Sequence, residues 1–177
     1  MDIRLEIFHS LLGTLRPGRL LDLGCGHGKF SVLARDLGWQ VTGVDARTER
    51  IPAESGIEWI EHDARTFPIE GFDCVAVLGL FYHLEIDDQI DLLARCGGTP
   101  TILDTHVSLR PTHQERGYDG QHFHEKLAAP TASWNNEWSF WPTEEALLRM
   151  LSDAGFRFTL KLSPPYRQDR TFYLALD

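Results

Sequence analysis

The sequence from residue 19 to residue 46 constrains the fold more than any other stretch. It opens with residues 20–23, three leucines and one aspartate, which predict a short buried strand. Gly24, Gly26 and Gly28 follow at once, and this spacing predicts a tight loop whose backbone can approach a ligand closely. The stretch therefore predicts a strand that leads directly into a glycine-rich loop.

A predicted helix and a second predicted strand complete this unit. Apolar residues recur at helical spacing over residues 30–37, and Gly38 marks the end of the helix. Residues 40–44, which include Val41 and Val44, predict a second buried strand, and Asp45 stands at its carboxyl end. A nucleoside can lie across the carboxyl ends of two such parallel strands, and an acid there can accept hydrogen bonds from ribose hydroxyls.

The glycine spacing distinguishes between nucleotide ligands. Residues 24–28 read Gly-Cys-Gly-His-Gly, a G-x-G-x-G pattern, whereas dinucleotide-binding loops have the pattern G-x-G-x-x-G. Asp22 lies two residues before the first glycine. A carboxylate at this place would repel a pyrophosphate and attract an amino group. The pattern therefore favours a ligand that carries a nucleoside at one end and an amine at the other.

With the run from Asp22 to Gly28 and with Asp45, the sequence resembles the class I S-adenosylmethionine-dependent methyltransferases. The resemblance covers nearly the whole chain. It implies an α/β fold with a doubly wound, Rossmann-like, mostly parallel sheet of seven strands, of which the last is antiparallel, and with helices on both faces. We expect a single methyltransferase domain over residues 1–177. The resemblance also implies that the glycine loop wraps the methionine part of the cofactor and that Asp45 holds the ribose.

Later strands are implied to supply further contacts to the S-adenosylmethionine. Asp63, after a third predicted strand, matches the acid that pairs with the adenine amine, although an aspartate at this place can equally cap a turn. Gly79 follows the fourth predicted strand and matches the methionine end, and His83 is either a ligand contact or a capping or core histidine. The predicted cofactor-binding residues are Asp22, Gly24, Cys25, Gly26, Gly28, Asp45, Ala46, Asp63, Ala64, Leu78, Gly79 and His83.

Residues 107–142 form a longer connection than this fold needs between its fifth strand and the following helix. The stretch is rich in aromatic residues and histidines, unlike a disordered linker. We interpret it as an inserted lid over the substrate. The alternatives are a segment that only closes the core and a contact in a homodimer, because Trp and Tyr are also enriched at interfaces.

Asp104, His106 and His124 are predicted to act on the methyl acceptor, and His83 is a further candidate base. Asp104 and His106 share one side of the fifth predicted strand near its carboxyl end. An imidazole, with an ordinary pKa of about 6.5, can accept a hydroxyl proton near neutrality, so His106 is the first candidate base, with His83 and His124 as alternatives. Asp104 is predicted to orient His106 or to ligate a divalent cation such as Mg²⁺, although magnesium sites use more carboxylates than we can place here.

The composition narrows the class of acceptor. An aromatic lid with scattered polar residues suits a small molecule or a saccharide, and residues 133–143 faintly resemble small actinobacterial O-methyltransferases that act on mannosides. A net charge of −9 argues against a nucleic-acid groove. O-methylation of a hydroxyl is therefore the predicted function. The alternatives are methylation of a modified RNA base and a non-catalytic protein that binds S-adenosylmethionine.

The cysteines and the hydropathy pattern bear on the cellular compartment. Three single cysteines without a C-x-x-C pair are typical of a reducing environment. No apolar run reaches the length that spans a bilayer, and we expect no signal peptide. These features predict a cytoplasmic protein without a membrane partner.

Overall fold

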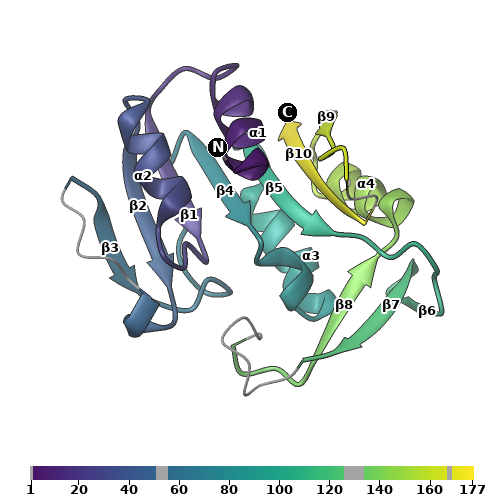
Figure 1. The fold of residues 1–177 in the computed structure, drawn as a ribbon. Helices are drawn as coiled ribbons and strands as arrows, with labels where there is room; N and C mark the ends of the chain where they lie inside the picture. Colours follow the sequence, from purple (N-terminus) through teal and green to yellow (C-terminus); the bar gives the residue numbers. More distant parts are fainter. Residues whose placement is uncertain (1, 51–55, 126–133, 167–168) are drawn as a thin grey trace.

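Figure 1 shows the computed structural model of the chain, which describes residues 2–50, 56–125, 134–166 and 169–177. These residues form one seven-stranded sheet and one three-stranded sheet. The large sheet contains β1 (Arg19–Leu23), β2 (Gln40–Asp45), β3 (Glu58–Glu61), β4 (Cys74–Leu78), β5 (Thr101–His106), β9 (Phe158–Leu162) and β10 (Arg170–Leu176). The small sheet contains β6 (His113–Glu115), β7 (Tyr118–His124) and β8 (Trp138–Pro142). The helices are α1 (Ile3–Leu12), α2 (Lys29–Asp36), α3 (Ile86–Cys96) and α4 (Glu144–Asp153), with short 3-10 helices η1 (Thr48–Arg50) and η2 (Phe81–His83).

The strand order in the large sheet is β3-β2-β1-β4-β5-β10-β9. From β3 to β5 every neighbouring pair is parallel, whereas β10 runs antiparallel to both β5 and β9. The chain winds in one direction from β1 to β3 and in the other from β4 outward, and ligands bind at the carboxyl ends of the strands where such an order reverses. The predicted fold, a doubly wound and mostly parallel sheet with an antiparallel last strand, is confirmed.

Helices cover both faces of the large sheet because its strands are apolar on both sides. Successive side chains of a strand point to opposite faces. Leu20 of β1 packs in a cluster with residues of α1 and α2, whereas Leu21 packs in a second cluster with residues of α3 and α4. β4, in the middle of the sheet, is buried at each of its positions. A parallel strand covered on both faces needs such a continuous apolar run.

The caps of the helices agree with the local sequence. The Thr143 hydroxyl accepts a hydrogen bond from the Ala146 amide over 3.1 Å, and Glu144 and Glu145 occupy the first turn of α4. A cap of this kind stabilises a helix by about 0.5–2 kcal/mol, and acids in the first turn complement the helix dipole. α4 therefore begins where its sequence predicts, directly after β8, and this fixes where the small sheet returns to the main domain.

The inserted stretch from residue 107 to residue 142 contains the small sheet, which the sequence analysis did not foresee. β7 pairs antiparallel with β6 and with β8. Arg116 and Gly117 connect β6 to β7 with φ angles of 52° and 83°, as a two-residue hairpin turn of the primed type requires. Ser108 and Thr143 form an isolated bridge at the base of the insertion. The middle of the stretch, residues 126–133, lies outside the described residues.

The structure also bears on the cysteines and on possible membrane spans. Cys25, Cys74 and Cys96 are buried and are not joined in disulfides. In the part of the chain that the structure describes, no helix combines the length and the apolar character needed to cross a bilayer.

Candidate functional site

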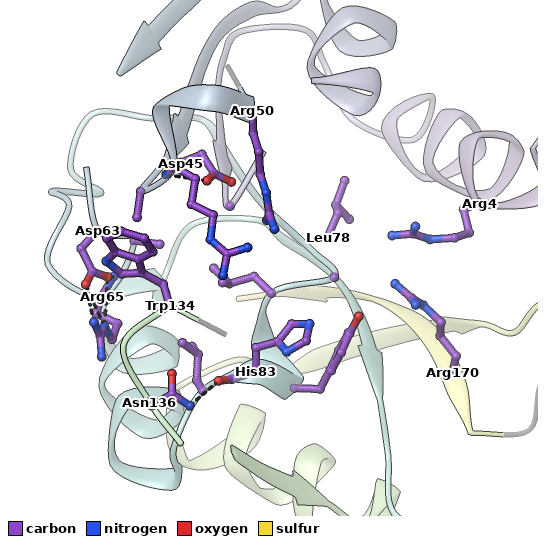
Figure 2. A pocket seen from close by; sticks show the side chains of 18 residues that line it. Arg4, Asp45, Arg50, Asp63, Arg65, Leu78, His83, Trp134, Asn136 and Arg170 are labelled. Carbon is purple, nitrogen blue, oxygen red and sulfur yellow. Dashed lines mark hydrogen bonds and ion pairs between the residues drawn. The ribbon is translucent and has the colours of Figure 1, made fainter. Parts of the chain in front are cut away.

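A pocket of about 330 Å³ opens at the carboxyl ends of β1, β2 and β4 (Figure 2). This edge is where the strand order reverses, the expected ligand position in an open α/β sheet. The pocket gathers residues that lie far apart in the sequence. The predicted cofactor-binding residues on its wall are Gly24, Asp45, Ala46, Asp63, Ala64, Leu78, Gly79 and His83. The other predicted residues, Asp22, Cys25, Gly26 and Gly28, lie in or next to the glycine loop behind this wall.

The glycine loop adopts a backbone conformation that other residues rarely take. Gly24, Gly26 and Gly28 have φ angles of 69°, 54° and 71°. The amides of Gly24 and Cys25 both donate to the Val44 carbonyl, over 2.8 and 3.0 Å, so the loop folds back against β2. A Cβ at Gly26 would meet nothing within 4 Å, so open space lies beside the backbone there. The glycines are therefore required by the turn itself, and the loop leaves room for a ligand.

Asp22 lies below the glycine loop and is almost fully buried. Burial raises the pKa of its carboxyl to about 6, while a hydrogen bond of 2.6 Å from the Ser31 hydroxyl works in the opposite direction. Cys25 is also buried, which raises the pKa of its thiol. Neither side chain is part of the pocket wall, so the contact of Asp22 with an amino group stays a prediction.

Asp45 joins the end of β2 to the glycine loop. Its Oδ2 accepts the Gly26 amide and its Oδ1 accepts the Arg47 amide, each over 2.9 Å. A carboxylate has about four acceptor positions, so both oxygens can accept further hydrogen bonds from a ligand. Asp45 and the adjacent Ala46 line the pocket. This geometry suits an acid that accepts hydrogen bonds from a ribose.

Asp63 lies at one end of the pocket and is held by Arg65. Asp63 Oδ1 accepts the Arg65 backbone amide over 2.9 Å, and Oδ2 accepts the guanidinium over 2.5 Å. Partial burial raises the pKa of Asp63, but the hydrogen bonds from Arg65 outweigh it and the pKa is lowered. The sequence allowed two roles for Asp63, a turn cap and a residue of the ligand site. The carboxylate does cap a turn, and it also lines the pocket.

His83 reaches the pocket from η2 and is held from behind by a buried acid. Its Nδ1 lies 2.9 Å from Oε1 of Glu125, which is 3% exposed and also accepts the Ser139 hydroxyl over 2.9 Å. Asn136 donates to the His83 carbonyl over 2.9 Å (Figure 2). Sequence analysis did not identify Glu125 as a partner of His83. In the sequence, Glu125 only follows the alternating histidines His122 and His124, and this pattern does not indicate that Glu125 contacts His83.

Asp104 has different partners from those predicted. It is fully buried on β5, and its carboxylate accepts hydrogen bonds from the guanidinium groups of Arg4, over 2.7 Å to Nε, and Arg170, over 2.8 Å to Nε. The Nδ1 atom of His106 contacts Asp169 over 3.0 Å instead. The predicted orientation of His106 by Asp104 is therefore corrected. The physical reason is that a fully buried carboxylate needs charged partners, and two arginines supply them.

His106 lies behind the pocket wall. Its ring stacks on Trp141, with 4.7 Å between ring centroids, and meets the edge of Tyr82 at 4.6 Å. Burial and the nearby Arg170 lower its pKa, against the opposing effect of Asp169. The imidazole is therefore neutral near pH 7. Tyr82, and not His106, is part of the pocket wall.

His124 lies away from this pocket on the small sheet. Its side chain is 53% exposed, with Nε2 3.3 Å from a Glu137 oxygen, and its ring meets the edge of Trp138 at 4.8 Å. A second pocket of about 900 Å³ lies next to the small sheet and includes His122 and Trp138. Among the described residues, no group of three or more His, Cys, Asp and Glu side chains could hold a metal ion.

Comparison with known proteins identifies the family. The profile of a methyltransferase domain family matches residues 3–161, and the chain belongs to this family. The resemblance to the class I S-adenosylmethionine-dependent methyltransferases is thereby confirmed. No curated protein sequence matches the chain significantly.

Several solved structures share the fold. The N-terminal domain of EvdMO1 with S-adenosylhomocysteine bound has a TM-score of 0.81 at 21% identity, over 99% of this chain and 80% of that one. The 1,6-didemethyltoxoflavin-N1-methyltransferase of Burkholderia thailandensis has a TM-score of 0.70 at 19% identity, over 98% and 76%. The glycopeptide N-methyltransferase MtfA with S-adenosylhomocysteine has a TM-score of 0.66 at 17% identity, over 97% and 86%. At these sequence identities the similarity shows a shared fold and nothing finer.

Proposed function

We propose that the protein transfers the methyl group of S-adenosylmethionine to a hydroxyl oxygen of a small molecule, with a saccharide as the favoured class. The observation that carries the proposal is the pocket itself, whose wall has two acids for a nucleoside and a histidine that Glu125 contacts from behind. The family assignment supports the reaction type. Among similar folds, the EvdMO1 domain has been crystallised in the presence of S-adenosylhomocysteine and D-fucose, which supports testing sugars first.

The residues of the pocket fit S-adenosylmethionine. Asp63 and Ala64 would receive the adenine, and Asp45 would accept hydrogen bonds from the ribose hydroxyls. The glycine loop and Gly79 would receive the methionine part. When bound, the cofactor supplies a methyl group on a positively charged sulfur, which a nucleophile can displace in line. The protein must then position the acceptor and accept its proton.

His83 is the residue that we propose as the general base. A carboxylate at Nδ1, such as that of Glu125, favours the tautomer that keeps a proton on Nδ1 and a lone pair on Nε2. His83 Nε2 would take up the hydroxyl proton while the acceptor oxygen takes the methyl group, and the bound cofactor would supply that methyl group and retain the electron pair of its carbon–sulfur bond. His106, the first candidate from the sequence, is the second choice because it is not among the residues that line the pocket, whereas Tyr82, which its ring contacts, is.

Amine methylation is the second candidate function. Two of the proteins with similar folds are described as N-methyltransferases, so the fold is compatible with nitrogen acceptors. An amine acceptor must also lose a proton, but its free form is already nucleophilic and depends less on a base. A strong dependence of turnover on His83 therefore favours oxygen. Methylation of RNA bases and a purely binding function remain as the alternative functions from the sequence. A homodimer in which residues 107–142 form the contact also remains a hypothesis.

The test is an assay of S-adenosylhomocysteine release with hexoses, the matching amino sugars and a modified RNA. Wild type is compared with His83→Gln, His106→Gln and a surface control, His9→Gln, each with Mg²⁺ and with EDTA. We expect turnover of a hydroxyl acceptor to fall about 10²- to 10⁴-fold in His83→Gln, with little change in the affinity for S-adenosylhomocysteine. An equal loss in the control, or turnover of amino sugars alone, would refute the proposal. The EDTA arm decides whether a divalent cation takes part.

A further inference from the structure

The pocket is basic although the chain is acidic. The protein has a net charge of −9, so a local excess of positive charge is not a general property of its surface. The pocket wall nevertheless carries more arginines than acids. The acids on the wall are Asp45 and Asp63, and the arginines are Arg4, Arg47, Arg50, Arg65 and Arg170. S-adenosylmethionine has two positive groups and one negative group, so its binding alone would increase this excess.

Two of these arginines share a single carboxylate. Arg4 comes from α1 and Arg170 from β10, and both donate to Asp104, which is fully buried. One guanidinium is enough to neutralise one carboxylate. The second leaves about one unit of positive charge on the cluster, which we call the Arg4–Asp104–Arg170 cluster. A purely structural ion pair would not need this surplus, because an unbalanced charge is expensive to remove from water.

The surplus faces the pocket. Figure 2 shows the side chains of Arg4 and Arg170 pointing toward each other at the end of the pocket that is remote from Asp63. Their side chains are 24% and 14% exposed, whereas Asp104 is covered. A Cβ added to Gly79 would lie 3.2 Å from Arg170 Nη2 and 3.3 Å from Arg4 Nη2. The absence of a side chain at Gly79 therefore keeps the approach to both guanidinium groups open.

We propose that the Arg4–Asp104–Arg170 cluster is a binding subsite for a carboxylate of a ligand in this pocket. A guanidinium presents parallel N–H donors that match the two oxygens of a carboxylate, and such charge-assisted hydrogen bonds are stronger than neutral ones. Asp104 acts as a positioning residue, since it holds the two guanidinium groups together against their mutual repulsion. The inference rests on the proposed function in one respect, that this pocket binds the cofactor and its acceptor.

The carboxylate has two possible sources. The amino-acid end of S-adenosylmethionine carries one, and an acidic acceptor, such as a uronic acid, would carry another. Arg4 is next to the glycine loop, because its guanidinium lies over the ring of Phe30, 5.0 Å from the centroid, in α2. Arg170 is next to the acceptor end, 5.4 Å from the centroid of Tyr82. Each source therefore has one arginine on its own side, and the experiment must distinguish them.

The first arm uses the wild-type protein and two cofactor analogues. Calorimetry compares S-adenosylhomocysteine with its decarboxylated form, which lacks only the carboxylate. The second arm compares KM for a uronic acid and for the neutral hexose of the same configuration. Both arms are repeated with Arg170→Gln, Arg4→Gln, the charge-preserving Arg170→Lys, and a control at an exposed arginine paired with the C-terminal residue, Arg157→Gln. Near-UV circular dichroism verifies that each variant is folded.

A carboxylate bound by the cluster should improve affinity about tenfold or more, the value of one charge-assisted hydrogen bond. A preference for S-adenosylhomocysteine that disappears in Arg4→Gln assigns the subsite to the cofactor. A preference for the uronic acid that disappears in Arg170→Gln assigns it to the acceptor. If the wild type binds the acid and neutral members of both pairs equally well, the inference is overturned.

The first arm needs no acceptor, so failure of O-methylation alone leaves its result intact. Because the acid and neutral ligands are compared on the wild type, a variant that does not fold cannot decide the outcome.

Discussion

Replacement of Asp45 by Asn would test the nucleoside end of the pocket. The carboxylate uses both oxygens, since Oδ2 accepts the Gly26 amide and Oδ1 accepts the Arg47 amide. An asparagine has one acceptor oxygen, and its amide group would face a backbone N–H with another N–H. The variant therefore loses one backbone hydrogen bond, which costs about 1 kcal/mol of stability, and the charged hydrogen bond to the ribose, which costs roughly 1.5–3 kcal/mol of binding free energy.

Loss of the hydrogen bond to the ribose corresponds to roughly 10- to 150-fold weaker binding of S-adenosylhomocysteine. The assay is isothermal titration calorimetry on the wild type, on Asp45→Asn and on Asp36→Asn, a control at a carboxylate whose side chain is 59% exposed. Urea unfolding of the same three proteins shows whether the fold is retained. A loss of less than about threefold in a folded Asp45→Asn protein would refute the assignment of Asp45 to the ribose, because loss of a charged hydrogen bond weakens binding by about tenfold or more.

Three further predictions concern stability, each measured by urea unfolding. Relative to Asp22→Asn, the wild type should lose about 3 kcal/mol of its free energy of unfolding between about pH 4 and pH 7. Burial raises the pKa of Asp22 from 3.8 to about 6, so in this range the folded state holds a proton that the unfolded state has released. A difference between the two proteins that does not vary with pH contradicts this. Asp104→Ala should destabilise the protein by about 3–5 kcal/mol, because it leaves two guanidinium groups without their carboxylate, and a loss below 1 kcal/mol would argue against that role. Gly43→Ala should cost about 1–3 kcal/mol, because its Cβ would lie 2.4 Å from the ring of Trp59, and an unchanged midpoint would show that the ring moves freely.

The fold and the nucleoside end of the site could be predicted because their signals are local. The glycine loop and Asp45 belong to one unit of fewer than thirty residues, in which each element directly follows the last. Apolar runs of strand length and the helix caps supply the rest of the topology. The small sheet was missed because its strands are short and polar on one face. Its turn at Arg116 and Gly117 was a usable signal that aromatic composition obscured.

The acceptor end could not be predicted because its contacts join distant parts of the chain. Glu125 lies 42 residues from His83, while Arg170 and Arg4 lie 66 and 100 residues from Asp104. No periodicity or motif connects such positions. The sequence does place Asp104 near the carboxyl end of a strand, but it does not reveal that two arginines converge there. Charge compensation in a buried site depends on the packed fold and not on local sequence.

The bridge between Ser108 and Thr143 has a consequence for how proteins of this kind diversify. The chain leaves the main domain and re-enters it at adjacent points, so the entropic penalty of a longer or shorter insertion rises only slowly with its length. The stretch between these points can be exchanged without any shift in the strands that hold the nucleoside end. Two residues in it, Glu125 and Asn136, nevertheless form hydrogen bonds with His83. A change of insertion could therefore bring a new acceptor and a new partner for the proposed base in a single evolutionary step, while the glycine loop, Asp45 and Asp63 lie outside the exchanged stretch.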